Sequence, residues 1–364
     1  MKIDRVHFYT RNAARTRDWF IRNVGFKAIG NSINRHTHTE LIALNSVFFV
    51  LSSPLNSASP VAQYLKSHPS GVVDIAFKVK NLTEILDRAS GLGLILQNIQ
   101  QERSNRGSFK YAKIAGWNNL EHTLIEGGDR VNCCLPNFEF KRDRSVNHHE
   151  LEITNIDHVV LNVNRDKLDS AVKLYQTLFN FQVQQSFEIQ TDRSGLTSQA
   201  LIDEGGEVQF NINQPTSPHS QIQEFIDLNC GSGIQHIALR SRNLIADLTK
   251  ISQRDLKFLD VPQTYYHLLE SLSLSVADKR AIAQLQILVD RDRHLPESLL
   301  MQIFTQPIFE QPTFFLEFIE RRRDAKGFGQ GNFKALFEAV EKEQEKRVLS
   351  RSNYSPTKLN IDTL

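Results

Sequence analysis

The order of apolar and polar positions repeats along the chain, and this repeat predicts the architecture. Residues 3–30, which read IDRVHFYTRNAARTRDWFIRNVGFKAIG, resemble residues 156–185, which read IDHVVLNVNRDKLDSAVKLYQTLFNFQVQQ. In both segments a short apolar strand leads through a polar turn into an amphipathic helix and then into a second strand. A residue that tolerates positive φ, Gly25 in one copy and Asn180 in the other, stands where each helix is expected to end.

A second pair of segments repeats the same pattern further along each half. The segment from Val72 reads VVDIAFKVKNLTEILDRASGLGLIL and matches the segment from Ile234, which reads IQHIALRSRNLIADLTKISQRDLKFL. The chain therefore consists of four modules, each a strand, a helix and further strands. We predict an N-terminal domain over residues 1–140 and a C-terminal domain over residues 152–347. Residues 348–364 are polar and aperiodic and are expected to be disordered.

A glycine-rich stretch, GFGQGNF at residues 327–333, precedes the last helical pattern. A dinucleotide fingerprint would need a third glycine at the position of Asn332, and a P-loop would need Gly-Lys-Ser/Thr, so neither phosphate-binding motif is present. Apolar residues then recur at i, i+3, i+4 and i+7 from Phe333, which predicts a helix. Two interpretations stay open: Phe333 packs in an ordinary core, or a hinged C-terminal lid delivers it to a pocket.

The charge balance and the cysteine content narrow the class of protein. The 364 residues carry 43 Lys and Arg against 41 Asp and Glu, with no block of like charge, so neither nucleic acid nor a membrane surface is indicated as a partner. Three cysteines, two of them adjacent, form neither a disulfide framework nor a Cys-x-x-Cys metal pair, which favours a reducing compartment. The N-terminus is charged throughout, and no apolar run reaches about 18 residues, so we expect a soluble cytoplasmic protein.

The two halves differ in kind at three matched strand positions. The C-terminal half carries two histidines and a glutamate at these positions, whereas the N-terminal half has none of these residue types there. The residues of the C-terminal half are His158, His236 and Glu317. Their N-terminal counterparts are Arg5, Asp74 and Thr123.

Each of these three C-terminal residues is expected on an apolar face of its strand. Side chains alternate along a strand, so His158 should share a face with Ile156 and Val160, and Glu317 with its own apolar neighbours. An ionised carboxylate there costs several kcal/mol unless a cation or strong donors meet it. Two histidines and one carboxylate form the facial triad of non-haem Fe(II) oxygenases, which leaves three positions for substrate and dioxygen. The alternatives are histidines satisfied within the core, and a Glu317 that pairs with Arg321 or faces water.

Several motifs of the C-terminal half are specific. They are IDHVV around His158, GIQHIAL around His236, LLMQIFTQP and FFLEFIER around Glu317, and GFGQGNFKALFEAVE near the C-terminus. Together they resemble the 4-hydroxyphenylpyruvate dioxygenases, a family with the vicinal oxygen chelate fold. The resemblance implies an α+β fold with two open eight-stranded β-barrels, each built from paired βαβββ modules, and a C-terminal helix. It also implies Fe(II), held by the two histidines and the glutamate.

The resemblance further implies a pocket around the metal and a role for each residue in it. The residues expected to take part in catalysis are Gln235, Gln302 and Phe333. The residues expected to bind the substrate are Ser198, Asn213, Gln221, Phe304, Phe315, Phe328 and Asn332. A flat phenol needs apolar faces and polar groups at its ends, which agrees with this mixture of aromatic, amide and hydroxyl side chains.

The implied reaction converts 4-hydroxyphenylpyruvate and dioxygen into homogentisate and CO2, a step of tyrosine catabolism. The 2-oxo acid would chelate Fe(II) through its keto and carboxylate oxygens. Oxidative decarboxylation would be followed by hydroxylation of the ring carbon that bears the side chain, and the acetate arm would migrate. The implied partners are this small molecule and dioxygen. A homo-oligomer is also expected, with a dimer favoured because most soluble oligomers are C2 dimers.

Three other functions stay open. Asn211 stands two residues before Asn213, where these dioxygenases usually have Pro, and the related 4-hydroxymandelate synthases also diverge there. The synthases hydroxylate the benzylic carbon of the same substrate, but Phe333 favours the dioxygenase because the synthases carry a smaller aliphatic residue at that position. The other two alternatives are a metal-free binding module of the same fold and an extradiol ring-cleaving dioxygenase.

Overall fold

The computed structural model describes most of the chain. The described residues are 1–104, 107–128, 139–140, 150–190, 194–291, 297–323, 325–333 and 335–342. The predicted tail, residues 348–364, lies outside these ranges, as does the stretch of residues 141–149 at the predicted domain boundary.

Four βαβββ modules follow one another along the chain, as the sequence repeats predict. The first consists of β1 (Lys2–Tyr9), α1 (Ala13–Asn23), β2 (Lys27–Ile33), β3 (Thr37–Leu44) and β4 (Val47–Pro54). The second consists of β5 (Gly71–Val79), α3 (Leu82–Gly91), β6 (Ile95–Ser104), β7 (Gly107–Ala115) and β8 (Glu121–Gly127). The third consists of β10 (Ile153–Asn162), α4 (Leu168–Phe179), β11 (Gln182–Gln190), β12 (Gly195–Ile202) and β13 (Gln209–Pro215). The fourth consists of β14 (Gly233–Ser241), α6 (Leu244–Ile251), β15 (Leu288–Arg291), β16 (Leu299–Phe304) and β17 (Phe315–Arg322).

Shorter elements join and extend these modules. They are α2 (Pro60–Tyr64), β9 (Glu139–Phe140), α5 (Gln221–Asn229), η3 (Gln263–Ser271), α7 (Val276–Gln284) and η4 (Gln330–Asn332). A last helix includes residues 333 and 335–342. None of the described helices is both long and apolar enough to cross a membrane.

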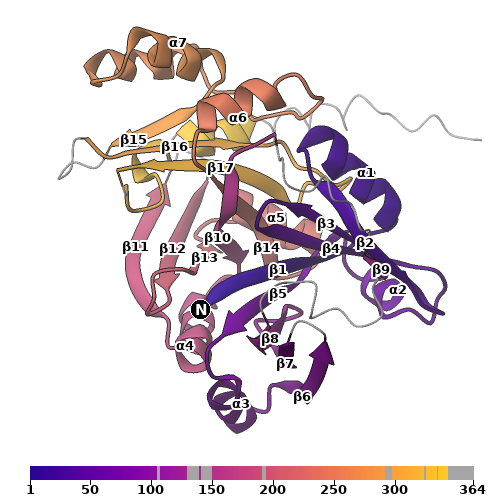
Figure 1. Ribbon diagram of the computed structural model, residues 1–364. Coiled ribbons are helices and arrows are strands. Elements are labelled where there is room, and N and C mark those ends of the chain that lie inside the picture. The colour runs from indigo at the N-terminus through magenta and orange to yellow at the C-terminus, as the bar shows by residue number, and fades with distance from the viewer. Residues whose placement is uncertain are drawn as a thin grey trace, which may run out of the picture.

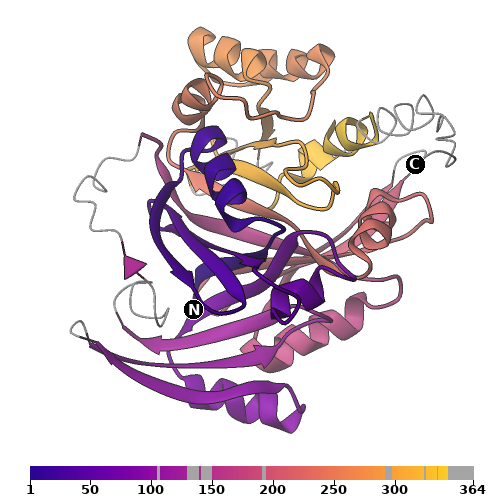
Figure 2. The same cartoon turned by 90° about the vertical axis from the view of Figure 1, so that its right-hand side faces the viewer.

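Each pair of modules forms one curled sheet, and the two sheets have the same strand order (Figures 1 and 2). The first sheet has the order β6-β7-β8-β5-β1-β4-β3-β2-β9, and the second has the order β11-β12-β13-β10-β14-β17-β16-β15. In each sheet the first strands of the two modules are antiparallel neighbours at the centre. The prediction of two open eight-stranded barrels is confirmed, and β9 adds a short strand at the β2 edge that the sequence patterns did not predict.

The helices of the two matched modules end at the residues that the sequence predicts. Asn180 caps α4 in the left-handed conformation, with φ of 56°. The C-cap of α1 is Val24, and Gly25 follows it with φ of 101°. A left-handed residue turns the chain away from the helix axis, so Phe26 and Phe181 enter the core at the start of the next strand.

The two sheets share one hydrophobic core. The cluster of buried side chains that includes Phe8 of β1 also includes Tyr175 of α4 and Phe318 of β17. The ring of Phe8 lies 5.1 Å from that of Phe314, at an interplanar angle of 83°. Such edge-to-face pairs stabilise a core beyond the burial of area, so the N-terminal sheet supports the sheet that carries the candidate site.

A buried histidine connects the first sheet to helix α4 of the third module through hydrogen bonds. His122 of β8 is fully buried, and its Nδ1 donates to the carbonyl oxygen of Ile75 at 3.0 Å. Its Nε2 lies 3.1 Å from the hydroxyl of Tyr175, which therefore donates to it. Burial lowers the pKa of His122, so the imidazole is neutral in the folded protein.

The neutral His122 makes the stability of the fold depend on pH. The ordinary pKa of histidine is about 6.5, so below that pH the unfolded chain binds a proton that folded His122 does not. The free energy of unfolding therefore falls as the pH drops through this value. We expect a shallower fall in a His122→Gln variant, measured by chemical denaturation across a pH series. Equal pH dependence in the two proteins would contradict this assignment.

Candidate functional site

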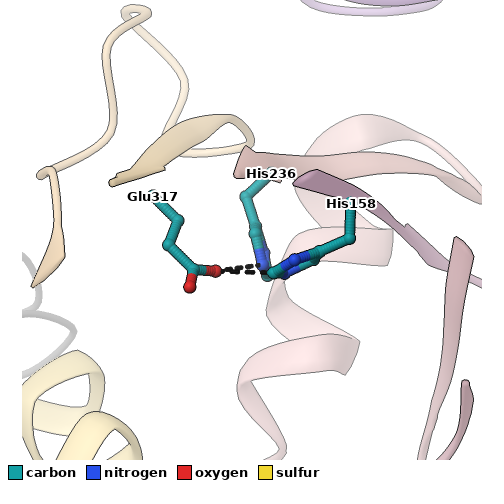
Figure 3. A group of neighbouring side chains, drawn as sticks. All are labelled: His158, His236 and Glu317. Carbon is teal, nitrogen blue, oxygen red and sulfur yellow. Dashed lines mark ion pairs between the residues drawn. The ribbon is translucent and has the colours of Figure 1, made fainter. Parts of the chain in front are cut away.

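Three adjacent strands at the centre of the second sheet bring the predicted metal ligands together. His158 lies on β10, His236 on β14 and Glu317 on β17. Ala238 of β14 lies opposite His158 on one side and opposite Glu317 on the other. The small side chain of Ala238 therefore stands between His158 and Glu317 on this face of the sheet. His236 precedes Ala238 by two residues and projects from the same face. Figure 3 shows the three side chains pointing toward one another.

The distances within this triad fit a metal ion. The Oε2 atom of Glu317 lies 3.1 Å from Nε2 of His158 and 3.4 Å from Nε2 of His236. Bonds of about 2.1 Å at right angles would separate neighbouring ligand atoms by about 3.0 Å. The three residues are 3%, 8% and 2% exposed in chain order. A buried carboxylate beside two imidazole nitrogens provides the donor set of a facial triad.

A bulge in β10 sets the direction of His158. The register slips by one residue between Ile156, which pairs with Leu239, and His158, which pairs with Ala238. Leu239 and Ala238 point to opposite faces, so Ile156 and His158 do too. The expectation that Ile156 shares a face with His158 is therefore wrong, because strict alternation does not hold across a bulge. The extra residue is Asp157.

The bulged Asp157 orients His158. One carboxylate oxygen, Oδ1, lies 3.0 Å from Nδ1 of His158, which leaves Nε2 directed at Glu317. Arg321 donates to both oxygens of Asp157, at 2.8 and 2.7 Å. The alternative in which Glu317 pairs with Arg321 is not what the structure shows. Burial would raise the pKa of Asp157, but Arg321 holds it well below its ordinary value.

His236 is held in a different way. The ring of Phe315 stacks on it, with centroids 4.7 Å apart and planes at 18°. The ring of Phe304 meets it edge-on at 6.1 Å. The buried Nδ1 of His236 has no hydrogen-bond partner among the described residues. Its orientation therefore depends on aromatic packing, whereas that of His158 depends on a carboxylate.

The electrostatics of the triad favour a cation. Burial opposes the charged form of His158, but Glu317 and Asp157 outweigh it and raise the pKa of His158 to about 9. Burial lowers the pKa of His236. Burial would raise the pKa of Glu317, but the two imidazoles lower it below its ordinary value. A proton and a metal ion therefore compete for the imidazole of His158 beside the carboxylate of Glu317.

A cavity opens beside the triad, between the sheet and the last helix. Predicted site residues that line it together with the triad are Ser198, Asn213, Gln221, Gln235, Phe304, Phe315 and Phe328. Lining residues that the sequence analysis did not assign to the site are Val160, Phe187, Leu196, Asn211, Ile222, Leu336, Phe337 and Val340. Oγ of Ser198 and Oδ1 of Asn211 are buried here and have no hydrogen-bond partner in the described part of the chain. Unpaired polar atoms on a cavity wall are typical of a ligand site.

Three predicted site residues lie outside the cavity lining. Gln302 is 1% exposed and lies behind Gly329, where an added Cβ would come within 2.3 Å of its Oε1. Asn332 is buried, and its Oδ1 accepts a hydrogen bond from the hydroxyl of Tyr265 at 2.6 Å. Phe333 is half-buried. In this structure these three residues therefore do not line the cavity.

Phe333 supports an aromatic wall from behind. Its ring lies 4.9 Å from the ring of Phe187, which does line the cavity. The same helix places Leu336, Phe337 and Val340 in the lining. The sequence could have identified these three lining residues, because they follow Phe333 at the helical spacings i+3, i+4 and i+7. Phe187 of β11 lies opposite Ser198 of β12, a residue that the sequence analysis assigned to the site. The register of these two strands cannot be read from the sequence, so Phe187 was not predicted.

Comparisons with known proteins agree on the fold. The Glyoxalase/Bleomycin resistance protein/Dioxygenase superfamily matches residues 155–270. An uncharacterized protein from Synechocystis sp. is 34% identical, over 94% of this chain and 97% of that protein. A 4-hydroxyphenylpyruvate dioxygenase from Yarrowia lipolytica is also 34% identical, over 94% of this chain and 92% of that protein. A mutant 4-hydroxymandelate synthase from Streptomyces coelicolor superposes with a TM-score of 0.84, over 94% of this chain and 98% of that one, at 24% identity.

Removing the carboxylate of Glu317 tests the metal site. Loss of a residue that only supports a metal ligand lowers metal affinity about 10- to 100-fold, and loss of the ligand itself should cost at least as much. We therefore expect a Glu317→Ala variant to bind a first-row divalent metal at least about 10-fold more weakly than the wild type. Metal content after equilibration and desalting, determined by mass spectrometry, measures this. Glu310→Ala is the matched control because Glu310 is 83% exposed. Unchanged metal content in the Glu317 variant would remove this residue from the site.

Proposed function

The chain belongs to the 4-hydroxyphenylpyruvate dioxygenase family, and from that premise we propose that it converts 4-hydroxyphenylpyruvate and dioxygen into homogentisate and CO2, with Fe(II) as its metal. The observation that carries the proposal is a buried triad of His158, His236 and Glu317 that faces a cavity with aromatic walls. The donor set of two imidazoles and one carboxylate is typical of non-haem Fe(II) oxygenases.

The triad and the cavity divide the work between them. Fe(II), when bound by the triad, would mediate the transfer to dioxygen of electrons that the 2-oxo acid and its ring provide. The protein holds the three ligands on rigid strands and leaves the side toward the cavity open. On that side Phe304 and Phe328 are buried and Phe315 is half-buried, and their rings exclude water from the site. Exclusion of water limits side reactions and strengthens every polar contact inside the site.

The remaining walls would orient the substrate. Its flat ring fits between the aromatic side chains, and its polar ends need donors and acceptors. Ser198 and Asn213 face each other across β12 and β13, and Nδ2 of Asn213 donates to Oδ1 of Asn162 at 3.2 Å. Ser198 retains an unpaired hydroxyl. We assign these two residues to the end of the substrate away from the metal.

Asn211 favours a second candidate, the benzylic hydroxylation performed by 4-hydroxymandelate synthases. Its carboxamide lines the cavity with Oδ1 unpaired, at the position where the dioxygenases usually have Pro. Asn211 of β13 lies opposite Val160 of β10, and Val160 lies opposite His236 of β14, so the three side chains share one face of the sheet. A polar group there could hold the ring in another orientation, which would change the carbon that is attacked.

The compartment and the oligomeric state are inferred from the sequence and not from the site. A cytoplasmic protein is supported by the sequence spacing of the three cysteines, which matches no disulfide framework. A homodimer is the expected assembly because C2 dimers are the commonest soluble oligomers.

The identity of the product separates the two candidates. Fe(II)-loaded protein, incubated with 4-hydroxyphenylpyruvate and dioxygen, should release homogentisate and one CO2 for each substrate consumed. Chromatography with mass spectrometry identifies the product. Hydroxymandelate as the product would replace the proposal with the synthase, and turnover of a catechol without any 2-oxo acid would replace it with ring cleavage.

The hydroxyl of Ser198 should contribute to substrate binding. A hydrogen bond of this kind contributes about 1–1.5 kcal/mol, so we expect Ser198→Ala to lower kcat/KM by roughly 10-fold, mostly through KM. Thr197→Ala is the matched control, since it removes a hydroxyl from the other face of β12. Iron content should be unchanged in both variants. Equal effects of the two substitutions would contradict the assignment of Ser198.

A further inference from the structure

We propose that Arg321 and Asp157 couple the C-terminal segment over the cavity to the metal ligand His158, so that metal binding and closure of this segment stabilise each other. Both are positioning residues, since they would act on the metal and the substrate through other groups. The inference rests on the metal site of the proposed function. It adds a reciprocal link between that site and residues 325–333.

One end of the link is the hydrogen bond from Nδ1 of His158 to Asp157, at 3.0 Å. Carboxylates that accept from the second nitrogen of a metal-binding histidine fix its ring and its tautomer. Asp157 cannot rotate freely, because the guanidinium of Arg321 holds both of its oxygens at 2.8 and 2.7 Å. The side chains of Asp157 and Arg321 are 1% and 5% exposed, so water does not replace these bonds.

The other end of the link is the backbone of the C-terminal segment. The remaining nitrogen of Arg321, Nη1, donates to the carbonyl oxygens of Ala325 at 3.1 Å and of Gly327 at 2.8 Å. The next residue, Phe328, lines the cavity, and its ring meets the ring of His158 edge-on at 5.4 Å. One guanidinium therefore fixes both the metal ligand and the start of the segment that closes the cavity.

The N-terminal sheet provides an internal comparison. It contains the same bulge, at Asp4, and Asp4 accepts a hydrogen bond from Arg5 at 2.8 Å. The position that matches Arg321 is Gly127 when the two Ile-Glu sequences are aligned. An arginine meets the bulged aspartate in both sheets, but its position differs: Arg5 stands at the position that matches His158, whereas Arg321 comes from the last strand. In the C-terminal sheet the position of Arg5 is thus taken by the metal ligand His158, and Arg321 also reaches the C-terminal segment.

A lysine cannot replace this arginine. The link needs a planar fork for Asp157 and further donors for two carbonyl oxygens, and an ammonium group is a point charge without that geometry. Arg321→Lys keeps the positive charge beside the buried carboxylate, so it avoids the large cost of leaving Asp157 unpaired. The substitution therefore tests the geometry of the link more than its charge.

The experiment measures both ends of the link in the full-length protein. The Fe(II) dissociation constant is determined without oxygen by competition with a chelator. Trypsin cleavage after Lys326, which is exposed within the segment, is followed by the fragment that begins at Gly327. Wild-type protein should release this fragment more slowly when Fe(II) is bound. We expect Arg321→Lys and Asp157→Asn to bind Fe(II) about 10- to 100-fold more weakly and to lose this protection even at saturating Fe(II).

The matched control is Arg323→Lys. The side chain of Arg323 is 66% exposed and pairs with Glu297 at the surface, so its variant should behave as the wild type in both measurements. Thermal unfolding of each variant shows whether it is folded. Should Arg321→Lys fail to fold, Asp157→Asn is measured in its place, because it removes the same link from the other side.

The outcomes separate this inference from the proposed function. Wild-type protein that binds no Fe(II) would overturn the proposed function itself. Wild-type protein that binds Fe(II) but is cleaved after Lys326 equally fast with and without it would overturn the coupling, whatever the variants do. A folded variant that keeps wild-type affinity, or that stays protected by Fe(II), would also overturn the coupling.

Discussion

The site depends on one costly interaction, the burial of the ionised carboxylate of Glu317. It is 2% exposed and lies against two imidazole nitrogens at 3.1 and 3.4 Å. A buried carboxylate is tolerated when positive charge or strong donors meet it, which is the condition that a bound metal ion satisfies. The surrounding features serve this requirement: Ala238 leaves room in the row between His158 and Glu317, and a bulge directs His158 toward the carboxylate.

The duplicated architecture separates what the fold needs from what the site needs. Both sheets have the same strand order, and both share one core. In the first sheet the matched positions satisfy one another, since Asp74 accepts a hydrogen bond from the backbone N–H of Thr123 at 2.9 Å. These described residues of the N-terminal sheet are therefore paired without a metal ion. The candidate site lies on the other copy of the repeat, as expected when function is a property of residues placed on a common scaffold.

The sequence predicted the features that depend on local pattern. The repeats identified four modules, and the unequal residues at matched strands identified the triad that the structure brings together. Features that depend on register were not predicted. Ile156 was placed on the wrong face because the bulge at Asp157 has no sequence signal, and Phe187 was missed because its pairing with Ser198 is a tertiary contact. The tail, residues 348–364, lies outside the described part of the chain.

The central claim is that one metal ion is bound by His158, His236 and Glu317 together. X-ray absorption spectroscopy at the iron edge, on protein loaded with Fe(II) without oxygen, tests it most directly. The account predicts a first shell of nitrogen and oxygen atoms at about 2.1 Å with outer-shell scattering from two imidazole rings. Loss of one imidazole should follow from either His158→Ala or His236→Ala. A spectrum of hydrated iron without imidazole scattering would contradict the account.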